Sequence, residues 1–477
     1  MKERKKIAFI HLDLGIGGAE QLIVHAARGL KRAGHDVVIY TSFFDPGRCF
    51  PGLELYNGSL DGLASEDNRR SVAAQDDNVI VPVVLRGTWI PRTLFGACTI
   101  LCSVLRMLWL SFCLPRGEFD VIVNDQVSNI NPWLRPKARE KLLFYCHFPD
   151  LLLCVARGSR LKRLYRAMFD AWERRTMAQC DVLCVNSVFT RDVFAQTFPE
   201  EFAKTSNDIV DKSIDEPEQP LQLHVLYPPV DLAEVAQHRP SPGSTADAQA
   251  RPGKISLDLQ PGRFLVSLNR FERKKQVELA LDAFSILVKK NQNETSAGAV
   301  RLVIAGGYDV RVQENVDYFR ELQDRAVKLG IHKKVLFMRS VSAAVRWWLL
   351  GNASALVYTP FNEHFGIVPV EAMALGTCVV ASDSGGPRES VADVGGFLVD
   401  HHAAGFYEGM ERALFMSAPE REALGKRAIQ RVEQKFSLEA FATNLERLVT
   451  EKVENKRCTR TVGASHQISK QTDKKRD

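Results

Sequence analysis

The first part of the chain alternates short apolar runs with an amphipathic stretch. Residues 7–11 and 37–41 are apolar runs of strand length, and the residues between them, 19–33, repeat apolar positions at helical spacing up to Gly34. A glycine-rich loop, 15–18, joins the first run to the helix. The pattern predicts a strand, a helix and a second strand, which together form a β-α-β unit.

This alternation continues along the chain, is interrupted once, and then restarts. Residues 200–262 are rich in Pro, Ser, Asp and Gln and lack the rhythm, so we expect surface insertions around a domain boundary there. Strands that alternate with helices on both sides of this break predict two parallel, doubly wound sheets. The expected strands lie at 78–85, 119–125, 141–148 and 181–187 before the break, and in "FLVSLNR" (264–270), "RLVIAGG", "VLFMRSV", "ALVYTPF", "CVVASDSGG" and "GFLVD" after it.

The predicted fold is therefore α/β, with two Rossmann-like domains of doubly wound parallel sheets that face a cleft. Folds of this kind bind ligands beyond the carboxyl ends of their strands, so we expect the functional residues on the loops that follow strands. The predicted parts are an N-terminal Rossmann-like domain (1–225), an insertion or linker (226–262), a C-terminal Rossmann-like domain (263–435), a C-terminal helix (436–452) and a basic, disordered tail (453–477).

Composition places the 477-residue chain among soluble globular proteins. Its net charge of +6 suits anionic substrates or a membrane surface, and its basic residues form no stripe, so no nucleic-acid partner is expected. The ten cysteines show neither a CxxC pair nor metal-ligand spacing, which indicates reduced thiols facing the cytosol. The start, "MKERKK", runs directly into a strand and predicts no signal peptide, so we take the sequons at Asn57, Asn293 and Asn352 as chance matches.

The first loop contains Gly15, Gly17 and Gly18, and three interpretations of it stay open. Glycines at a helix N-terminus let a phosphate or a sugar lie close to the backbone. A dinucleotide site is the second interpretation, but the second strand ends in "YTS" (40–42) without the acidic residue that such a site needs. The third is a tight turn, for which glycine is a usual residue.

Two cations follow the first strand of the second domain. Arg270 stands at the strand end in "NRFERKKQ", and Lys275 lies just before the next helix. A guanidinium can bind a diphosphate with two hydrogen bonds, and an ammonium binds it as a point charge. A solvated charged loop is the alternative, and the position at the cleft favours the diphosphate site.

The stretch "FNEHFGIVPVEAM" (361–373) sets Glu363 and Glu371 eight positions apart after the strand "ALVYTP". Pro369 is typical of the first residue of a helix, so the N–H groups just before it are expected to form an anion site. Glu371 then falls in the first helical turn, where interaction with the helix dipole is the alternative to a binding role. The expected anion site consists of the backbone N–H groups of Gly366, Ile367 and Val368.

Two carboxylates first suggest a glycoside hydrolase, in which one acts as acid and the other as nucleophile or base. Cations and N–H groups aimed at one spot suit instead an enzyme that binds and releases a nucleoside diphosphate, such as a glycosyltransferase. His147, in "FYCHFPDLLL", stands just beyond a strand of the first domain on the cleft side. A ligand role and a purely structural role both stay open for it.

Together these residues resemble the retaining GT-B glycosyltransferases of family 4. The resemblance rests on the E-x7-E of Glu363 and Glu371, the R-x4-K of Arg270 and Lys275, and "SDSGGPRES" (382–390). Within this family the chain is similar to the dolichyl-linked oligosaccharide α-1,3/1,6-mannosyltransferases of N-glycan assembly, from about residue 7 to 450. The stretches that carry this similarity are "HLDLGIGGAE", "FYCHFPDLLL", "LKRLYRA", "NRFERKK", "AGGYD" and "NEHFGIVPVEAM".

The resemblance implies transfer of mannose from GDP-mannose to Man-GlcNAc2-diphosphodolichol, first in α-1,3 and then in α-1,6 linkage, at the cytosolic face of the endoplasmic reticulum membrane. Other mannosyltransferases of the pathway are further candidate partners. The resemblance implies that Arg270 and Lys275 bind the donor diphosphate and that Glu371 binds the ribose hydroxyls. It also implies that Glu363 contacts the transferred sugar and that His147 contacts the 6-hydroxyl side of this sugar. Gly17 and Gly18 would line the phosphate and acceptor side.

Retention of configuration needs no covalent enzyme adduct in this arrangement. As the sugar–phosphate bond breaks, charge grows on the leaving diphosphate, where fixed cations and a helix N-terminus stabilise it. We therefore expect no metal and no cofactor. The β-phosphate oxygen is expected to take the proton of the incoming hydroxyl, so that neither glutamate acts as a nucleophile.

Residues 94–114 are long enough to span a bilayer but carry Arg106 near their centre. They connect two strands of one sheet, so we expect a helix in the membrane interface or, alternatively, a buried crossover helix. The chain ends "KKRD", which resembles a dilysine retrieval signal, with chance as the alternative. The side chains expected near the lipid headgroups are Trp89, Arg92, Trp109 and Arg116.

Two rival functions remain. One is a catalytically silent subunit of a glycosyltransferase assembly, and the other is a different sugar-nucleotide enzyme on the same two-domain plan. A silent subunit has no need of both cations, both glutamates and His147 together, which favours the enzyme.

Overall fold

The structure is a computed structural model. It describes residues 3–15, 17–50, 52–56, 79–94, 98–153, 160–199, 223–238, 259–290 and 300–451. Most of the predicted insertions near 50–80 and 200–260, the tail 453–477 with its terminal lysines, and the sequons at Asn57 and Asn293 lie outside these residues.

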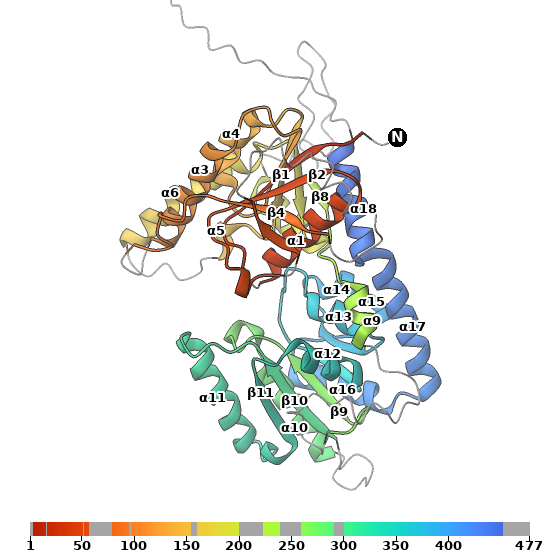
Figure 1. The fold of residues 1–477 in the computed structure, drawn as a ribbon. Helices are drawn as coiled ribbons and strands as arrows, with labels where there is room; N and C mark the ends of the chain where they lie inside the picture. The colour runs from red at the N-terminus through yellow and green to blue at the C-terminus, as the bar shows by residue number, and fades with distance from the viewer. Residues whose placement is uncertain are drawn as a thin grey trace, which may run out of the picture.

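The first domain is built on a parallel sheet whose described strands number eight, in the order β3-β4-β2-β1-β5-β6-β7-β8. Figure 1 shows helices on both faces of this sheet. The strands are β1 (Lys6–His11), β2 (Asp36–Thr41), β3 (Leu53–Leu55), β4 (Val81–Leu85), β5 (Val121–Asn124), β6 (Lys141–Cys146), β7 (Val182–Val185) and β8 (Leu223–Val225). The helices are α1 (Gly18–Arg32), α3 (Thr99–Cys113), α4 (Asn131–Leu134), α5 (Asp150–Leu153), α6 (Arg160–Met177) and α7 (Val188–Thr197).

The second domain repeats the plan with six described parallel strands, in the order β11-β10-β9-β12-β13-β14. The strands are β9 (Phe264–Leu268), β10 (Arg301–Gly306), β11 (Val335–Arg339), β12 (Ala355–Tyr358), β13 (Cys378–Ser382) and β14 (Gly396–Val399). The helices are α9 (Leu232–His238), α10 (Glu278–Lys290), α11 (Gln313–Lys328), α12 (Ala343–Asn352), α13 (Ile367–Ala374), α14 (Pro387–Ser390), α15 (Ala392–Gly395), α16 (Ala403–Phe415) and α17 (Ala418–Lys435).

The predicted fold class is therefore confirmed: two doubly wound α/β domains follow one another along the chain. Strands of both sheets are buried on both faces, which explains why they read as continuous apolar runs rather than as alternating ones. Because all strands of a sheet run parallel, the loops that follow them gather at one edge of each domain.

The apolar segment predicted at 94–114 forms the crossover helix α3. One side of α3 is buried in the first domain, and there the guanidinium of Arg106 pairs with the carboxylate of Asp13. The predicted crossover helix is therefore confirmed, with one side exposing large side chains, and its contact with a membrane stays a prediction. No helix among the described residues has the length and apolar character needed to cross a membrane. The exposed side chains of α3 are those of Leu105, Trp109 and Phe112.

The last described helix, α18 (Leu438–Thr450), returns from the second domain to the first. In Figure 1 it lies beside α1, whereas α17 runs along the second domain. Its apolar side chains Phe441, Leu445 and Leu448 join the core formed by α1 and β1. The ammonium of Lys141 donates to the carbonyl oxygen of Leu448 at 3.1 Å, so the tie between the two domains is also polar.

Helices α1 and α18 approach each other closely at Gly29. A Cβ atom added there would lie 2.8 Å from the Cβ of Ala442. Alanine favours a helix interior over glycine by about 1 kcal/mol, but an overfilled interface costs about 1–3 kcal/mol. We expect Gly29→Ala to lower the free energy of unfolding by about 1 kcal/mol in urea titrations.

The matched control is the double variant Gly29→Ala with Ala442→Gly, in which the contact again holds one methyl group, now on α1 instead of α18. It should recover most of the lost stability. If Gly29→Ala alone instead raised the free energy of unfolding by about 1 kcal/mol, the full difference in helix propensity, the close packing of α1 on α18 would be contradicted.

Candidate functional site

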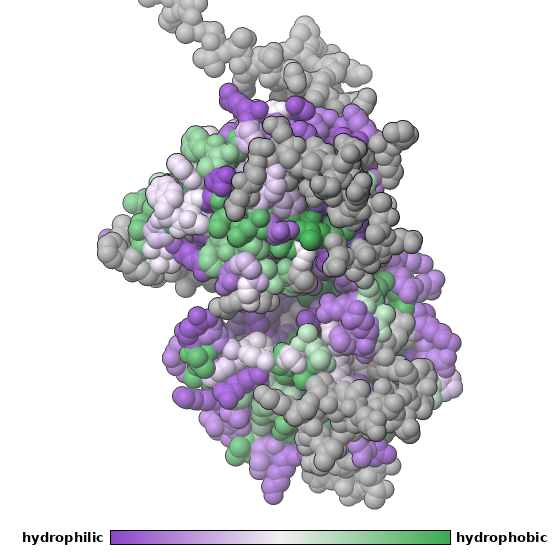
Figure 2. Space-filling view, viewed as in Figure 1, coloured by the Kyte–Doolittle hydropathy of each residue, from purple (hydrophilic) through white to green (hydrophobic). Residues whose placement is uncertain are grey.

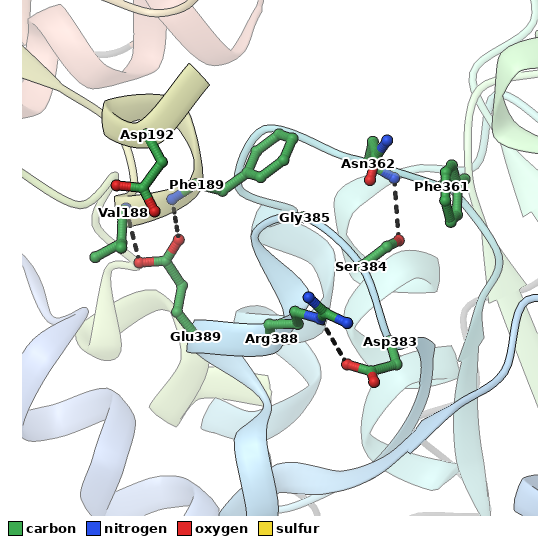
Figure 3. Close-up of a pocket in the computed structure, with 10 residues that line it drawn as sticks. All are labelled: Val188, Phe189, Asp192, Phe361, Asn362, Asp383, Ser384, Gly385, Arg388 and Glu389. Carbon is green, nitrogen blue, oxygen red and sulfur yellow. Dashed lines mark hydrogen bonds and ion pairs between the residues drawn. The ribbon is translucent and has the colours of Figure 1, made fainter. Parts of the chain in front are cut away.

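The strand ends of the two domains meet across a cleft. The N-terminus of α7 in the first domain faces the loops after β12 and β13 of the second, and a cavity of about 390 Å³ lies between them. Figure 3 shows the carboxylate of Glu389 reaching across to the backbone N–H groups of Val188 and Phe189, at 2.9 and 3.1 Å. The functional loops of both domains are thus in direct contact.

Lys275 and Glu363 form an ion pair at the strand ends of the second domain. The ammonium of Lys275 contacts the carboxylate of Glu363, and both side chains are largely shielded, at 11% and 23% exposure. Lys275 lies in a 3₁₀ turn before α10, and its carbonyl oxygen accepts from the hydroxyl of Thr359 at 2.7 Å. The turn after β9 and the loop after β12 are therefore joined by charge and by hydrogen bonding.

Tyr358 links Arg270 to this pair. Burial and then the nearby carboxylate of Glu363 raise the pKa of Tyr358 well above its usual value, so the phenol stays protonated and hydrogen-bonds Glu363. Arg270 also acts on the Tyr358 phenol electrostatically. The guanidinium itself is 63% exposed and pairs with Glu272 at 2.9 Å, so it can turn toward a ligand at small cost.

Helix α13 begins at Ile367, two residues earlier than predicted, and Pro369 is its third residue. Gly366 precedes the helix with φ of +81°, a left-handed conformation that starts the helix at once. Proline is tolerated inside the first turn because its missing N–H would have no intrahelical partner there. The correction moves Glu371 to the fifth helical position, beyond the first turn, so interaction with the helix dipole no longer accounts for it.

Glu371 is buried, at 4% exposure, and its first carboxylate oxygen pairs with the guanidinium of Arg346 from α12. Its second oxygen is buried without a hydrogen-bond partner among the described residues. A buried carboxylate oxygen without a partner is costly, and it is suited to accept a hydroxyl from a ligand. No motif in the sequence indicated Arg346 as a partner of Glu371.

Residues 359–366, which we call the glutamate loop, rest on the stretch "SDSGGPRES". A Cβ at Gly386 would lie 2.4 Å from the backbone of Phe365, and one at Gly385 would lie 2.4 Å from the carbonyl oxygen of Glu363. The N–H of Gly386 donates to that carbonyl oxygen at 2.8 Å. These two glycines therefore let the backbone of the glutamate loop lie directly on the loop after β13.

His147 belongs to a buried network of the first domain that the sequence did not predict. Its Nε2 lies 3.4 Å from a carboxylate oxygen of Asp125, and Nδ1 of His11 lies 2.9 Å from the same oxygen. Burial would raise the pKa of Asp125, but its two histidine neighbours outweigh burial and lower it. Burial would likewise lower the pKa of His11, and Asp125 outweighs it and raises it. Asp125 therefore carries a negative charge that both rings share.

Gly17 and Gly18 open helix α1, as expected, but the space in front of them is partly taken. A Cβ at Gly17 would lie 2.3 Å from a carboxylate oxygen of Glu20, whereas one at Gly18 would meet nothing within 4 Å. Ile16 of the same loop lies outside the described residues. A phosphate at this helix end would first have to displace the carboxylate of Glu20.

The structure thus gathers Arg270, Lys275, Glu363 and the start of α13 on one wall of the cleft, with His147 on the opposing domain. Glu371 lies deeper, against α12. Among the described residues no group of three or more histidine, cysteine, aspartate or glutamate side chains is arranged to hold a metal ion. Residues that the sequence did not single out are His11, Asp125, Phe148, Ser187, Arg346, His364 and Glu389.

Comparison with known proteins gives two family matches, one for each half of the chain. Residues 16–206 match Glycosyltransferase Family 4, and residues 255–431 match Glycosyl transferases group 1. Among solved structures, sucrose-phosphate synthase from Thermosynechococcus elongatus superposes with a TM-score of 0.65 at 19% identity, covering 93% of this chain and 98% of that one. Anabaena HepE in complex with UDP gives 0.61 at 17% identity, with 93% and 99% covered. These likenesses show the GT-B fold.

Curated relatives are similar over nearly the whole chain. The alpha-1,3/1,6-mannosyltransferase ALG2 of Homo sapiens is 38% identical over 459 residues, 94% of this chain and 96% of that protein. The ALG2 proteins of Rhizomucor pusillus and Dictyostelium discoideum are 38% and 35% identical, over 93% and 94% of this chain and 91% and 99% of theirs. The chain therefore belongs to the α-1,3/1,6-mannosyltransferases of glycosyltransferase family 4.

Proposed function

We propose that this enzyme transfers mannose from GDP-mannose to the lipid-linked acceptor Man-GlcNAc2-diphosphodolichol, first in α-1,3 and then in α-1,6 linkage. The proposal rests on one observation: Lys275 and Glu363 form an ion pair, and Glu363 lies on the loop that leads into the N-terminus of α13. One cation, one carboxylate and the backbone N–H groups at the start of a helix suit a sugar bound to a diphosphate.

The donor diphosphate lies, in this proposal, between Lys275, Arg270 and the N–H groups of Gly366, Ile367 and Val368. A diphosphate that reaches Lys275 takes the place of Glu363 in the present ion pair. The carboxylate is then released toward the sugar hydroxyls, on the loop that leads into the anion site three residues later. Glu371 accepts from the ribose through its buried oxygen without a partner.

Retention follows from where charge develops. Lys275, Arg270 and the start of α13 stabilise the negative charge that grows on the leaving diphosphate. The bond between the anomeric carbon and the β-phosphate oxygen breaks, and the acceptor oxygen bonds to that carbon on the same face of the ring. The departing β-phosphate oxygen takes the proton of the acceptor hydroxyl. Glu363 carries out no covalent step: once the diphosphate has replaced it at Lys275, it keeps its hydrogen bond from Tyr358 and contacts the sugar hydroxyls. Neither a metal nor a cofactor takes part in this scheme.

The acceptor approaches from the first domain, on the side of His147. Its polyprenol chain places the enzyme at a membrane, and we propose the cytosolic face of the endoplasmic reticulum. The proposed membrane surface of the protein consists of the exposed apolar side chains on and beside α3. Figure 2 shows hydrophobic side chains at the outer edge of the first domain, where α3, α4 and α6 lie in Figure 1. Other mannosyltransferases of the pathway are the protein partners that we expect there.

The central test is transfer by the purified protein to a short-chain lipid diphosphate trisaccharide, Man-GlcNAc2, with GDP-mannose as donor. The wild type should add two mannoses in sequence. Removing a group that stabilises the transition state costs about 10²–10³-fold in kcat, so Lys275→Ala and Glu363→Ala should both lose activity on this scale. Glu371→Ala should act mainly by raising KM for GDP-mannose. Product analysis by mass spectrometry and linkage-specific mannosidases reads out both steps.

Glu422→Ala is the matched control, because Glu422 is an exposed glutamate of α17 that pairs with Lys426 at the surface. It should keep wild-type activity. If the wild type forms no product, or if Glu363→Ala and Glu371→Ala both keep full activity, the proposed function is contradicted.

Membrane contact is tested with vesicles. Trp89 and Trp109 contact each other edge to face at 5.3 Å, and Trp89 and Phe112 are 69% and 65% exposed. Aromatic side chains of this kind favour the membrane interface. We expect the protein to float with liposomes that contain anionic lipid, and Trp89→Ser combined with Phe112→Ser to weaken binding about ten-fold or more.

The control exchanges the exposed Phe415 of the second domain for serine and should leave flotation unchanged. Circular dichroism verifies that all variants are folded. Wild-type flotation by the double variant would place the membrane contact elsewhere.

A further inference from the structure

Two aromatic rings meet across the cleft directly beside the site residues. Phe148 follows His147 in the first domain, and His364 follows Glu363 in the second. Their rings are stacked almost parallel, with centroids 3.6 Å apart and an interplanar angle of 6°. The contact therefore lies one residue away along the chain from His147 and from Glu363, the two residues proposed to contact the sugar.

The turn after β7 fixes both partners of this stack. The side-chain amide of Asn186 donates to the carbonyl oxygen of His147 at 2.9 Å. The hydroxyl of the next residue, Ser187, donates to the carbonyl oxygen of His364 at 2.5 Å. Two consecutive, buried side chains of the first domain thus hold the loop of His147 and the loop of Glu363 in register.

The N-terminus of α7 strengthens this attachment. The carboxylate of Glu389 accepts from the N–H groups of Val188 and Phe189, as Figure 3 shows, and from the hydroxyl of Tyr227 at 2.9 Å. A carboxylate at a helix N-terminus satisfies otherwise unpaired donors and is favoured by the helix dipole. The second domain is therefore bound to α7 on one side and to Phe148 on the other.

The stack joins two uncharged rings. Burial lowers the pKa of His364 to about 4, and the cations Lys275 and Lys274 act in the same direction, against Glu363. At neutral pH the imidazole is uncharged, so it can lie on a phenyl ring without the loss of a hydration shell around a charge. A planar ring, rather than a charge, is what this position requires.

We propose that Phe148 and His364 are a positioning pair that sets the separation of His147 and Glu363 across the transferred sugar. This inference rests on the proposed function of the site. Groups that must face a reacting sugar from two domains lose about 10²-fold in rate when they are misplaced by about 1 Å. The nucleoside diphosphate contacts lie within the second domain, so the pair acts on sugar transfer and leaves nucleotide binding alone.

The experiment measures kcat, KM for GDP-mannose and Kd for GDP in three variants of the full-length protein. Phe148→Leu keeps the apolar volume but removes the flat ring, and kcat should fall about 10- to 100-fold. Its Kd for GDP should stay within about two-fold, because Arg270, Lys275 and the start of α13 are untouched. Phe148→Tyr and His364→Phe keep a flat ring and should retain kcat within about three-fold. Phe415→Leu, at an exposed phenylalanine, is the matched control.

Each outcome of the experiment either supports or overturns the positioning role of Phe148 and His364. A Phe148→Leu variant with wild-type kcat overturns the inference, and so does an equal loss of GDP affinity, which indicates damage to the fold. A His364→Phe variant as impaired as Phe148→Leu also overturns it, because the imidazole itself is then required. No transfer by the wild type counts against the proposed function instead, and the two failures are thereby distinguished.

Discussion

The ion pair of Lys275 and Glu363 is the interaction on which the cleft wall of the second domain depends. Strands β9 and β12 are neighbours at the centre of the sheet, so the turn after one lies beside the loop after the other. Their opposite charges, both largely shielded from water, stabilise this approach, and the hydrogen bond from Thr359 to the carbonyl oxygen of Lys275 adds to it. Breaking the pair by removal of one partner leaves a shielded charge uncompensated. A ligand must therefore replace the pair rather than disrupt it.

The same loop also connects the two domains. The glutamate loop packs on Gly385 and Gly386 within the second domain. Across the cleft, Ser187 donates a hydrogen bond to this loop and Phe148 stacks on its His364. Helix α18 adds a second connection by joining the core of the first domain, far from the cleft. With attachments at the cleft and at the back, the relative position of the domains is determined by specific contacts and not by the length of the linker alone.

Local patterns were sufficient to predict most of the strands, the order of the two domains and the positions of the strand-end residues. Strands β3 and β8 were missed, because they lie in the stretches near 50–80 and 200–260 that were interpreted as insertions. Periodicity and glycine position are local properties, so Gly34 was recognised at the end of the first helix. The start of α13 was misplaced, because Pro369 is as acceptable at the third helical position as at the first. Arg346, Asp125 and His364 were missed because their partners are distant in sequence: only the fold brings Arg346 to Glu371 or Phe148 to His364. A single sequence carries no signal for such pairs.

The charges on both sides of the cleft are already paired before a ligand arrives. In the second domain Lys275 compensates Glu363, and Arg346 compensates Glu371. In the first domain one negative charge on Asp125 is shared by His11 and His147, of which His147 is the partly exposed one, at 30%. A sugar diphosphate that enters such a site exchanges one partner for another, so it does not have to pay for newly buried, isolated charges. Donors that are already oriented also need little reorganisation as charge moves onto the leaving group. In the proposed site the paired arrangement therefore favours a charged sugar diphosphate over a neutral sugar, which offers no charge to replace Glu363 beside Lys275.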